Sequence, residues 1–265
     1  MPQDSSHRPT DVRMKGFVRR WTVQDCMDWI EQQMPTPQQE TISLADAAGR
    51  ALAVDISSQT DVPHFTRAMM DGFAVVATDT SGATTYNSLT LNVVGESLPG
   101  NPFDGEVSSG SAIRIMTGAP MPVGADAVLP VEHTVIHEST IQIHGEVAPG
   151  RHVGLPGEDI QAGTIVLQRN RRLRPQDLGL LSSIGVQELQ VLQRPRVRLI
   201  ITGNELLPPG SNPTQFSITD ANSPMLTALV QRDGGVVIHP GIIPDNPASI
   251  LDALNTEAEI IVVSG

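Results

Sequence analysis

A short apolar run closed by a glycine constrains the fold of this chain more than any other stretch. Five of the six residues from Val197 to Thr202 are apolar or β-branched, and Gly203 ends the run. This length and composition predict a strand buried on both faces, as in a parallel sheet. Glu205 follows at once, and open parallel sheets bind ligands beyond the carboxyl ends of their strands. Taken alone, Glu205 is equally well an exposed acid in an ordinary turn.

The residues after this run alternate between helical and strand patterns. Asn222, read as a capping side chain, begins a helix that Gly234 ends. A second strand, a helix capped by Asn246 and a third strand at 259–265 follow. This order predicts right-handed crossovers and a doubly wound α/β sheet. The sequence stops at the first glycine after the third strand, so we expect a sheet domain truncated at its C-terminal end.

Composition argues against several classes of protein. The net charge is −12, and residues 59–149 hold ten acids and two bases, Arg67 and Arg114. We therefore expect neither nucleic-acid binding nor attraction to acidic membranes. No apolar run approaches the roughly 20 residues that span a bilayer. The single cysteine, Cys26, excludes an internal disulfide framework and favours a cytoplasmic protein.

Two further domains are predicted before the sheet. Thr22, with Asp25 three residues on, caps a helix to about residue 33, and residues 42–54 and 175–184 also show helical spacing. Short alternating runs broken by glycine and proline predict strands at 73–76, 89–94, 112–116, 127–131 and 140–147. The expected domains are a flexible leader (1–16), a discontinuous helical or linker domain (17–56 and 150–192), an inserted small β domain (57–149) and the sheet domain (193–265).

Isolated patterns carry weaker chemical signals. Asp71 precedes a glycine, which is most often an ordinary turn, and Thr117 begins a rigid turn after a predicted strand. The arginines within residues 169–174 form the only basic cluster, either a solvated face or a phosphate clamp. The sequence contains no Walker-type loop, dinucleotide fingerprint or serine nucleophile elbow.

Six motifs occur in one order over about residues 22–265. They are SLADAAGRALA (43–53), PHF with AMMDGFAV (63–75), RIMTGAP (114–120), GED (157–159), TGNEL (202–206) and DAN (220–222). In this order they resemble the molybdopterin molybdenumtransferase (MoeA) family, which includes the E domain of gephyrin and its plant counterpart. The agreement of six ordered motifs is far more specific than any one of them.

The resemblance implies a fold, an activity and partners. The fold would combine a linker domain used for dimerisation, the β domain and a MogA-like sheet domain. The activity would be insertion of molybdate into the dithiolene of adenylylated molybdopterin, with release of AMP and assistance from Mg²⁺. The resemblance also implies a homodimer whose active site combines the sheet domain of one subunit with the β domain of the other. The adenylyltransferase that supplies the substrate is a further expected partner.

The resemblance assigns site residues in two groups. Carried over by motif, the catalytic residues would be Asp71, Thr117, Asp159 and Glu205. The pterin- or cofactor-binding residues would be Gly203, Asp220, Asn222, Ser264 and Gly265, the last two beginning a glycine-rich loop. No residue is assigned as a metal ligand. Carboxylates suit Mg²⁺ or proton transfer, and a hydroxyl beside backbone N–H groups suits an oxyanion.

The sequence departs from the family pattern, and alternatives remain. Asn204 stands where the family usually has aspartate, and Ala68 where it often has serine. Asparagine carries no charge, so we expect weaker metal binding at that position. The alternatives are a non-catalytic pterin-binding or scaffold protein of the same fold, and a nucleotide or sugar-nucleotide hydrolase with a similar α/β domain. The sequence does not distinguish molybdate from tungstate as the substrate.

Overall fold

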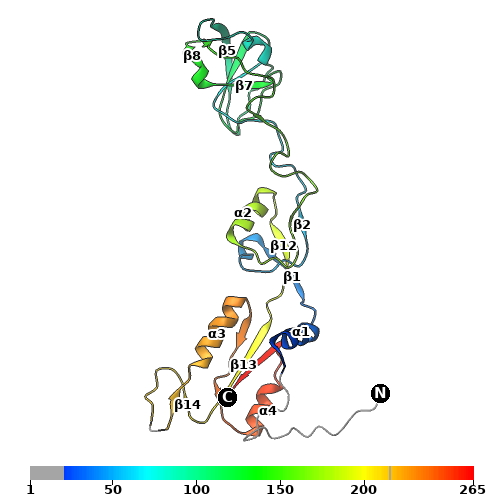
Figure 1. Cartoon of the computed structure of the whole chain (residues 1–265), viewed down its shortest axis with the longest axis vertical. Helices are drawn as coiled ribbons and strands as arrows, with labels where there is room; N and C mark the ends of the chain where they lie inside the picture. Colours follow the sequence, from blue (N-terminus) through cyan, green and yellow to red (C-terminus); the bar gives the residue numbers. More distant parts are fainter. Residues whose placement is uncertain (1–20, 215) are drawn as a thin grey trace, which may run out of the picture. The chain divides into compact units, whose positions relative to one another are not determined.

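The computed structural model describes residues 21–214 and 216–265, which divide into two compact units (Figure 1). Gln39–Leu192 forms one unit, here called the inserted unit. The residues on either side of it form the other, the sheet unit, which includes residues 21–38. The predicted leader at 1–16 lies outside the described residues. The finer domain boundaries expected from the sequence stay a prediction.

The sheet unit is built around one central strand. Its elements are α1 (Val23–Gln33), β13 (Arg196–Thr202), β14 (Leu206–Leu207), β15 (Ile218–Thr219), α3 (Asn222–Asp233), β16 (Val236–Ile238), β17 (Ile242–Ile243), α4 (Pro247–Leu254) and β18 (Ile260–Ser264). β13 pairs in parallel with β16, β17 and β18. β16 and β17 pair with successive stretches of β13, and β18 pairs with residues that overlap both stretches. β18 therefore lies along the other edge of β13. The predicted parallel sheet is confirmed.

Helices cover both faces of this sheet, as a doubly wound arrangement requires. Ile200 of β13 is buried against Ala253 of α4. Val197 of β13 and Val230 of α3 both lie close to Gly235, where a side chain at that position would collide with them. Val197 therefore faces α3. Residues three apart on a strand point to opposite faces. Figure 1 accordingly shows α3 and α4 on opposite sides of β13.

The capping predictions for two helices of the sheet unit are confirmed. Thr22 and Asp25 form the reciprocal capping box of α1, and the Asn246 side chain accepts from the backbone N–H of Ser249 at the start of α4. α1 buries none of its residues, so its apolar side chains remain exposed. Within the described residues, no helix has the length and apolar character to cross a lipid bilayer.

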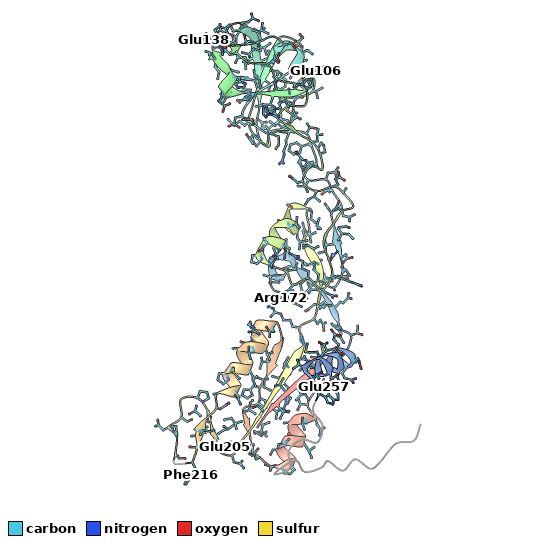
Figure 2. All side chains as sticks on the ribbon, in the orientation of Figure 1. Glu106, Glu138, Arg172, Glu205, Phe216 and Glu257 are labelled. Carbon is cyan, nitrogen blue, oxygen red and sulfur yellow. The ribbon has the colours of Figure 1, made fainter. Side chains whose placement is uncertain are left out.

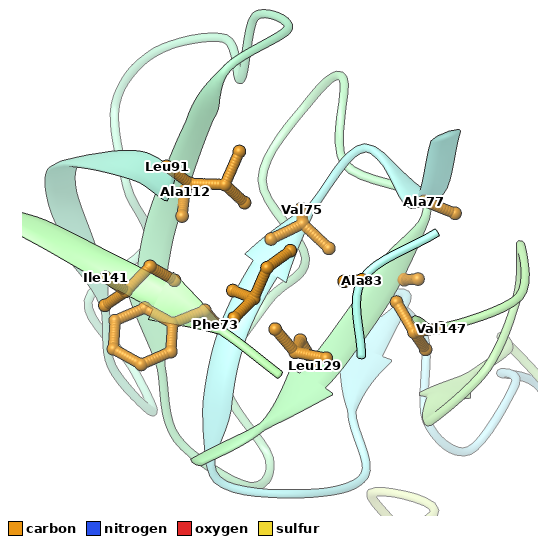
Figure 3. Packing of buried hydrophobic residues seen from close by; sticks show 11 residues of the cluster. Phe73, Val75, Ala77, Ala83, Leu91, Ala112, Leu129, Ile141 and Val147 are labelled. Carbon is orange, nitrogen blue, oxygen red and sulfur yellow. The ribbon is translucent and has the colours of Figure 1, made fainter. Parts of the chain in front are cut away.

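A six-stranded sheet forms the first core of the inserted unit. In spatial order its strands are β7 (Ala127–Pro130), β4 (Gly72–Val75), β6 (Ser111–Ile115), β5 (Leu89–Ser97), β9 (Thr140–Ile143) and β8 (Thr134–His137). Figure 3 shows Phe73, Val75, Leu129 and Ile141 packed on one face. The five predicted strands are confirmed, and β8 completes the sheet beside β9. Gly72 is required here, since a side chain at this position would collide with the Leu129 carbonyl.

The second core of the inserted unit lies among short elements. They are β1 (Gln39–Ser43), the 3₁₀ turn η1 (Leu44–Asp46), β2 (Ile56–Ser57), β11 (Ile165–Leu167), α2 (Pro175–Ser183) and β12 (Glu188–Leu192). β1 pairs with β12 and β2 with β11, all antiparallel. Leu52, Leu181 and Val191 are buried together between them. Two smaller elements of the unit, β3 (Arg67–Ala68) and β10 (Val153–Gly154), pair with each other.

The predicted helix at 42–54 is wrong. Ile42 belongs to β1, and only the 3₁₀ turn η1 follows. Gly49 takes a left-handed conformation at φ +76°, which ends any helix, and Leu52 then bridges to Val191. Of the small residues that suggested a helical face, Ala47 is fully buried in the core, whereas Ala48 is exposed.

Most arginines of the basic cluster make hydrogen bonds or ion pairs within the fold. Arg171 and Arg174 both donate to Asp177 in the first turn of α2, and Arg172 donates to the Gly49 carbonyl. Hydrogen bonds from Arg171 and then Arg174 hold the pKa of the buried Asp177 well below its usual value. These contacts account for three of the clustered arginines and weaken the phosphate-clamp interpretation.

Candidate functional site

In the sheet unit, the predicted cofactor-binding residues meet at the carboxyl ends of the strands. Gly203 follows β13, and Gly265 follows β18 directly beside it. A side chain on Gly265 would collide with the Thr202 hydroxyl, so the two strand ends lie in close contact. The Asn222 side-chain amide donates to the Ser264 hydroxyl at 2.8 Å. This bond ties the start of α3 to the end of β18.

Asp220 lies just before Ala221, the N-cap residue of α3, and its side chain caps the first turn of the helix. It is 4% exposed, and its carboxylate accepts from the backbone N–H groups of Asn222 and Ser223 at 2.9 and 3.0 Å and from the Ser223 hydroxyl. Burial acts to raise the pKa of Asp220, but these hydrogen bonds outweigh it and hold the pKa below its usual value. The predicted capping role of Asn222 is therefore wrong, because Asn222 is the first residue of α3, Ala221 is the N-cap residue, and the carboxylate that accepts from the first N–H groups belongs to Asp220.

Glu205 lies on the loop between β13 and β14 (Figure 2). It is exposed, and no described residue makes a hydrogen bond to its carboxylate. The preceding residue, Asn204, accepts through its side-chain oxygen from the backbone N–H of Asp245 at 3.2 Å. That bond joins the loop after β13 to the loop after β17, so the neutral side chain at 204 has an anchoring role. The Glu205 carboxylate remains available for a proton or a cation.

In the inserted unit, Asp71 and Thr117 form a second group. One oxygen of Asp71 accepts from both the backbone N–H and the hydroxyl of Thr117, each at 2.7 Å. The backbone N–H first, and the hydroxyl second, lower the pKa of Asp71 below its usual value. Both residues are exposed. Asp71 is thus a fixed carboxylate that stays ionised at neutral pH.

Asp159 is held by an arginine that the sequence interpretation did not select. Arg67 Nη2 lies 3.1 Å from Asp159 Oδ2. Arg67 and Ala68 make up β3. The backbone N–H of Ala68 donates to Ala119, and Gly118 donates to the Ala68 carbonyl, so β3 is bonded to the turn that begins at Thr117. Asp159, Thr117 and Asp71 therefore belong to loops attached to the same short strand. The available signal was that Arg67 is one of two bases in a stretch with ten acids.

The arrangement bears on Mg²⁺, which the resemblance implies. Among residues 21–214 and 216–265, no three histidine, cysteine, aspartate or glutamate side chains gather closely enough to hold a metal ion. Mg²⁺ commonly binds one or two carboxylates together with substrate phosphates, and does not need a cage made only of protein groups. The exposed Glu205 and Asp71 fit that mode. Asp220 does not, since its oxygens already serve α3.

Comparisons with known families agree with this organisation. A family model described as "MoeA N-terminal region (domain I and II)" matches residues 21–185. A second, described as "Probable molybdopterin binding domain", matches residues 198–265. The first match ends in the inserted unit, and the second begins in β13.

Individual relatives and solved structures give the same result. "Molybdopterin molybdenumtransferase 2" of Mycobacterium tuberculosis is 38% identical over 92% of this chain and 61% of its own length. "Molybdopterin molybdenumtransferase" of Haemophilus influenzae is 37% identical over 88% of this chain and 58% of its own length. A crystal structure of the molybdopterin biosynthesis moeA protein of Pyrococcus horikoshii OT3 matches with 36% identity and a TM-score of 0.84, covering 89% of this chain and 64% of that one.

The chain thus spans about three fifths of the length of the curated relatives it matches. Within that span, the first family model covers α1 and the inserted unit up to residue 185, and the second model covers the sheet with its strand-end residues. Ordered motifs, fold and family models agree, and the chain belongs to the MoeA family.

Proposed function

We propose that the full-length protein is a molybdopterin molybdenumtransferase that inserts molybdate into adenylylated molybdopterin and releases AMP. Two transferases named above, at 37–38% identity, support this activity. The observation that carries the proposal is Glu205, an exposed carboxylate without a described partner, beyond the carboxyl end of the central parallel strand. Ligands of such sheets bind in this position.

The strand ends offer groups that suit an anionic pterin substrate. The Ser264 hydroxyl and the Asn222 amide already contact each other, so their positions are fixed before a ligand arrives. Gly265 is exposed at the end of β18, and exposed backbone N–H groups in such turns bind oxyanions well, whereas Gly203 is buried and donates its N–H to the Ile243 carbonyl. Asp220 has an indirect role here, because it fixes the turn that carries Asn222.

Asp71 and Glu205 suit different tasks. The lowered pKa of Asp71 makes it a poor proton donor at neutral pH and a good electrostatic partner for a cation. Glu205, with no fixed hydrogen bond, suits the transfer of protons as molybdate loses oxide. Mg²⁺, bound to either carboxylate and to substrate phosphate, would neutralise the phosphoanhydride as AMP leaves. The Thr117 hydroxyl holds Asp71 in place.

The test is molybdate-dependent AMP release from adenylylated molybdopterin by the full-length protein. We expect the wild type to release AMP, and Glu205→Gln to lose about 10²-fold or more in rate, since it keeps the shape but removes the base. Asp252→Asn, a change of an exposed carboxylate on α4, serves as the matched control and should keep the rate. A Glu205→Gln protein with full activity would remove Glu205 from the mechanism.

The other members of the expected assembly are proposals of the same kind. A homodimer, the adenylyltransferase as a supplying partner and a cytoplasmic location rest on the family resemblance and the composition. The names of the relatives do not favour the scaffold alternative. If the wild type bound the pterin but released no AMP when molybdate was added, the scaffold interpretation would replace the transferase.

A further inference from the structure

We propose that Arg67 is a positioning residue for Asp159 in the reaction proposed above, on which this inference rests. Arg67 Nη2 and Asp159 Oδ2 are 3.1 Å apart and join residues 92 positions apart in the sequence. No other ion pair to Asp159 is found among the residues described. The pair is the direct link between β3 and the carboxylate expected in the active site.

The Arg67 side chain is partly enclosed by its neighbours. Its Cγ, together with Met69 Sδ and Glu158 Oε2, lies within 3.3 Å of the position that a Gly154 side chain would take. Its Nε is buried and has no hydrogen-bond partner in the described part of the chain. The stem of the side chain and Nε are thus enclosed, while the guanidinium reaches Asp159. A confined donor fixes the position of a mobile acceptor.

The backbone around Arg67 connects the pieces of the site in the inserted unit. On one side β3 pairs with β10, which leads to the Asp159 loop. On the other side Arg67 bridges to Pro120, in the turn that begins at Thr117. A displacement of Arg67 would therefore change where Asp159 lies relative to the Asp71–Thr117 pair.

The pair is better explained by positioning than by stability. The side chains of Arg67 and Asp159 are 30% and 55% exposed. Ion pairs this exposed contribute little to folding because water screens them and both side chains lose freedom. Asp159 would otherwise be a mobile carboxylate on a glycine-rich loop with Glu158 beside it. An arginine here compensates the negative charge and selects one orientation.

The test is a double-mutant cycle in the full-length protein, read as molybdate-dependent AMP release. We expect Arg67→Met and Asp159→Asn each to lose up to about 10²-fold in rate, the scale of a misplaced catalytic group. Because Arg67 acts through Asp159, the double variant should be no slower than Asp159→Asn alone. Arg67→Lys, which keeps the charge, should recover part of the loss. Arg169→Met, at an exposed arginine of the same unit, is the control and should keep the rate.

Each outcome decides a different point. An active wild type with full activity in Arg67→Met would overturn this inference and leave the proposed function intact. Losses that multiply in the double variant would also overturn it, because they indicate that the two residues act independently of each other. Unchanged melting temperatures in all variants show that the losses do not come from unfolding. A wild type without AMP release would overturn the proposed function and this inference together.

Discussion

Asp71, Asp159, Asp220 and Glu205 carry the same charge, yet each meets different surroundings. Asp71 accepts two hydrogen bonds from Thr117, Asp159 pairs with Arg67, and Asp220 caps a helix. Glu205 has no described partner. The four carboxylates therefore differ in their hydrogen bonds and ion pairs and not in their charge: Asp71 is held by Thr117, Asp159 by Arg67 and Asp220 by the start of α3, while Glu205 is exposed.

The Thr117 hydroxyl offers a test of this distinction. Thr117→Val removes the hydroxyl and keeps the backbone N–H, so the pKa of Asp71 should rise part of the way to its usual value. The acid limb of the pH–rate profile for AMP release should move to higher pH. The rate at neutral pH should fall about tenfold, the scale of one hydrogen bond to a charged group. Thr117→Ser should behave as wild type, and an unmoved acid limb in Thr117→Val would contradict the assignment.

At this scale the sequence selected candidate residues but not the contacts that they make. Motifs selected Asp220 and Asn222, but only coordinates show that Asp220 is consumed by the α3 cap while Asn222 reaches Ser264. The sequence motifs did not identify Arg67 as a site residue, because its partner Asp159 is 92 residues away in the chain. Contacts between distant segments depend on the register of short strands such as β3, which no local pattern reveals.

Elements with strong local signals were predicted well, and those that depend on tertiary pairing were not. β13, α3 and α4 have clear periodicity and end signals, and they form where expected. The stretch 42–54 also showed helical spacing, but β12 supplies an antiparallel partner for β1 and Gly49 turns the chain. Tertiary pairing overrides a weak helical preference in a segment this short.

The cap of α3 has a predictable effect on stability. Asp220→Ala leaves the first N–H groups of the helix without their acceptor, so the free energy of unfolding should fall by about 1–2 kcal/mol. Urea denaturation followed by circular dichroism measures this change. Asp252→Ala, at an exposed site on α4, should change the free energy far less. Equal losses in the two variants would argue against the capping role.

A second element-level prediction concerns the start of the parallel pair β13–β18. Glu259 accepts from the side chain and the backbone N–H of Arg196, and these bonds lower its pKa from 4.5 to about 2. A carboxylate with a lowered pKa stabilises the fold above its unfolded pKa and loses that contribution as the pH falls. Wild type should therefore lose stability relative to Glu259→Gln between about pH 4.5 and pH 2. Parallel pH profiles for the two proteins would contradict this.

For the molecule as a whole, the expected homodimer has a sharp test. Suppose that each active site combines Asp71 of one subunit with Glu205 of the other, as the family resemblance implies. Asp71→Asn and Glu205→Gln homodimers should then both be inactive, while a mixed dimer holds one intact site and recovers about half of the wild-type rate. Tandem affinity tags on the two variants isolate the mixed dimer. An inactive mixed dimer would show that both residues serve the site from one chain.

The chain crosses between the two units at adjacent points. Gln39 and Leu192 are paired in β1 and β12, and the next residue, Gln193, donates its backbone N–H to the Gln38 carbonyl at 2.8 Å. The inserted unit thus departs and returns through one hydrogen-bonded ribbon. A short turn joining Gln38 to Gln193 would span that gap without stretching the backbone. The inserted unit could consequently be replaced or removed as one segment, without changing the connections between the strands of the parallel sheet.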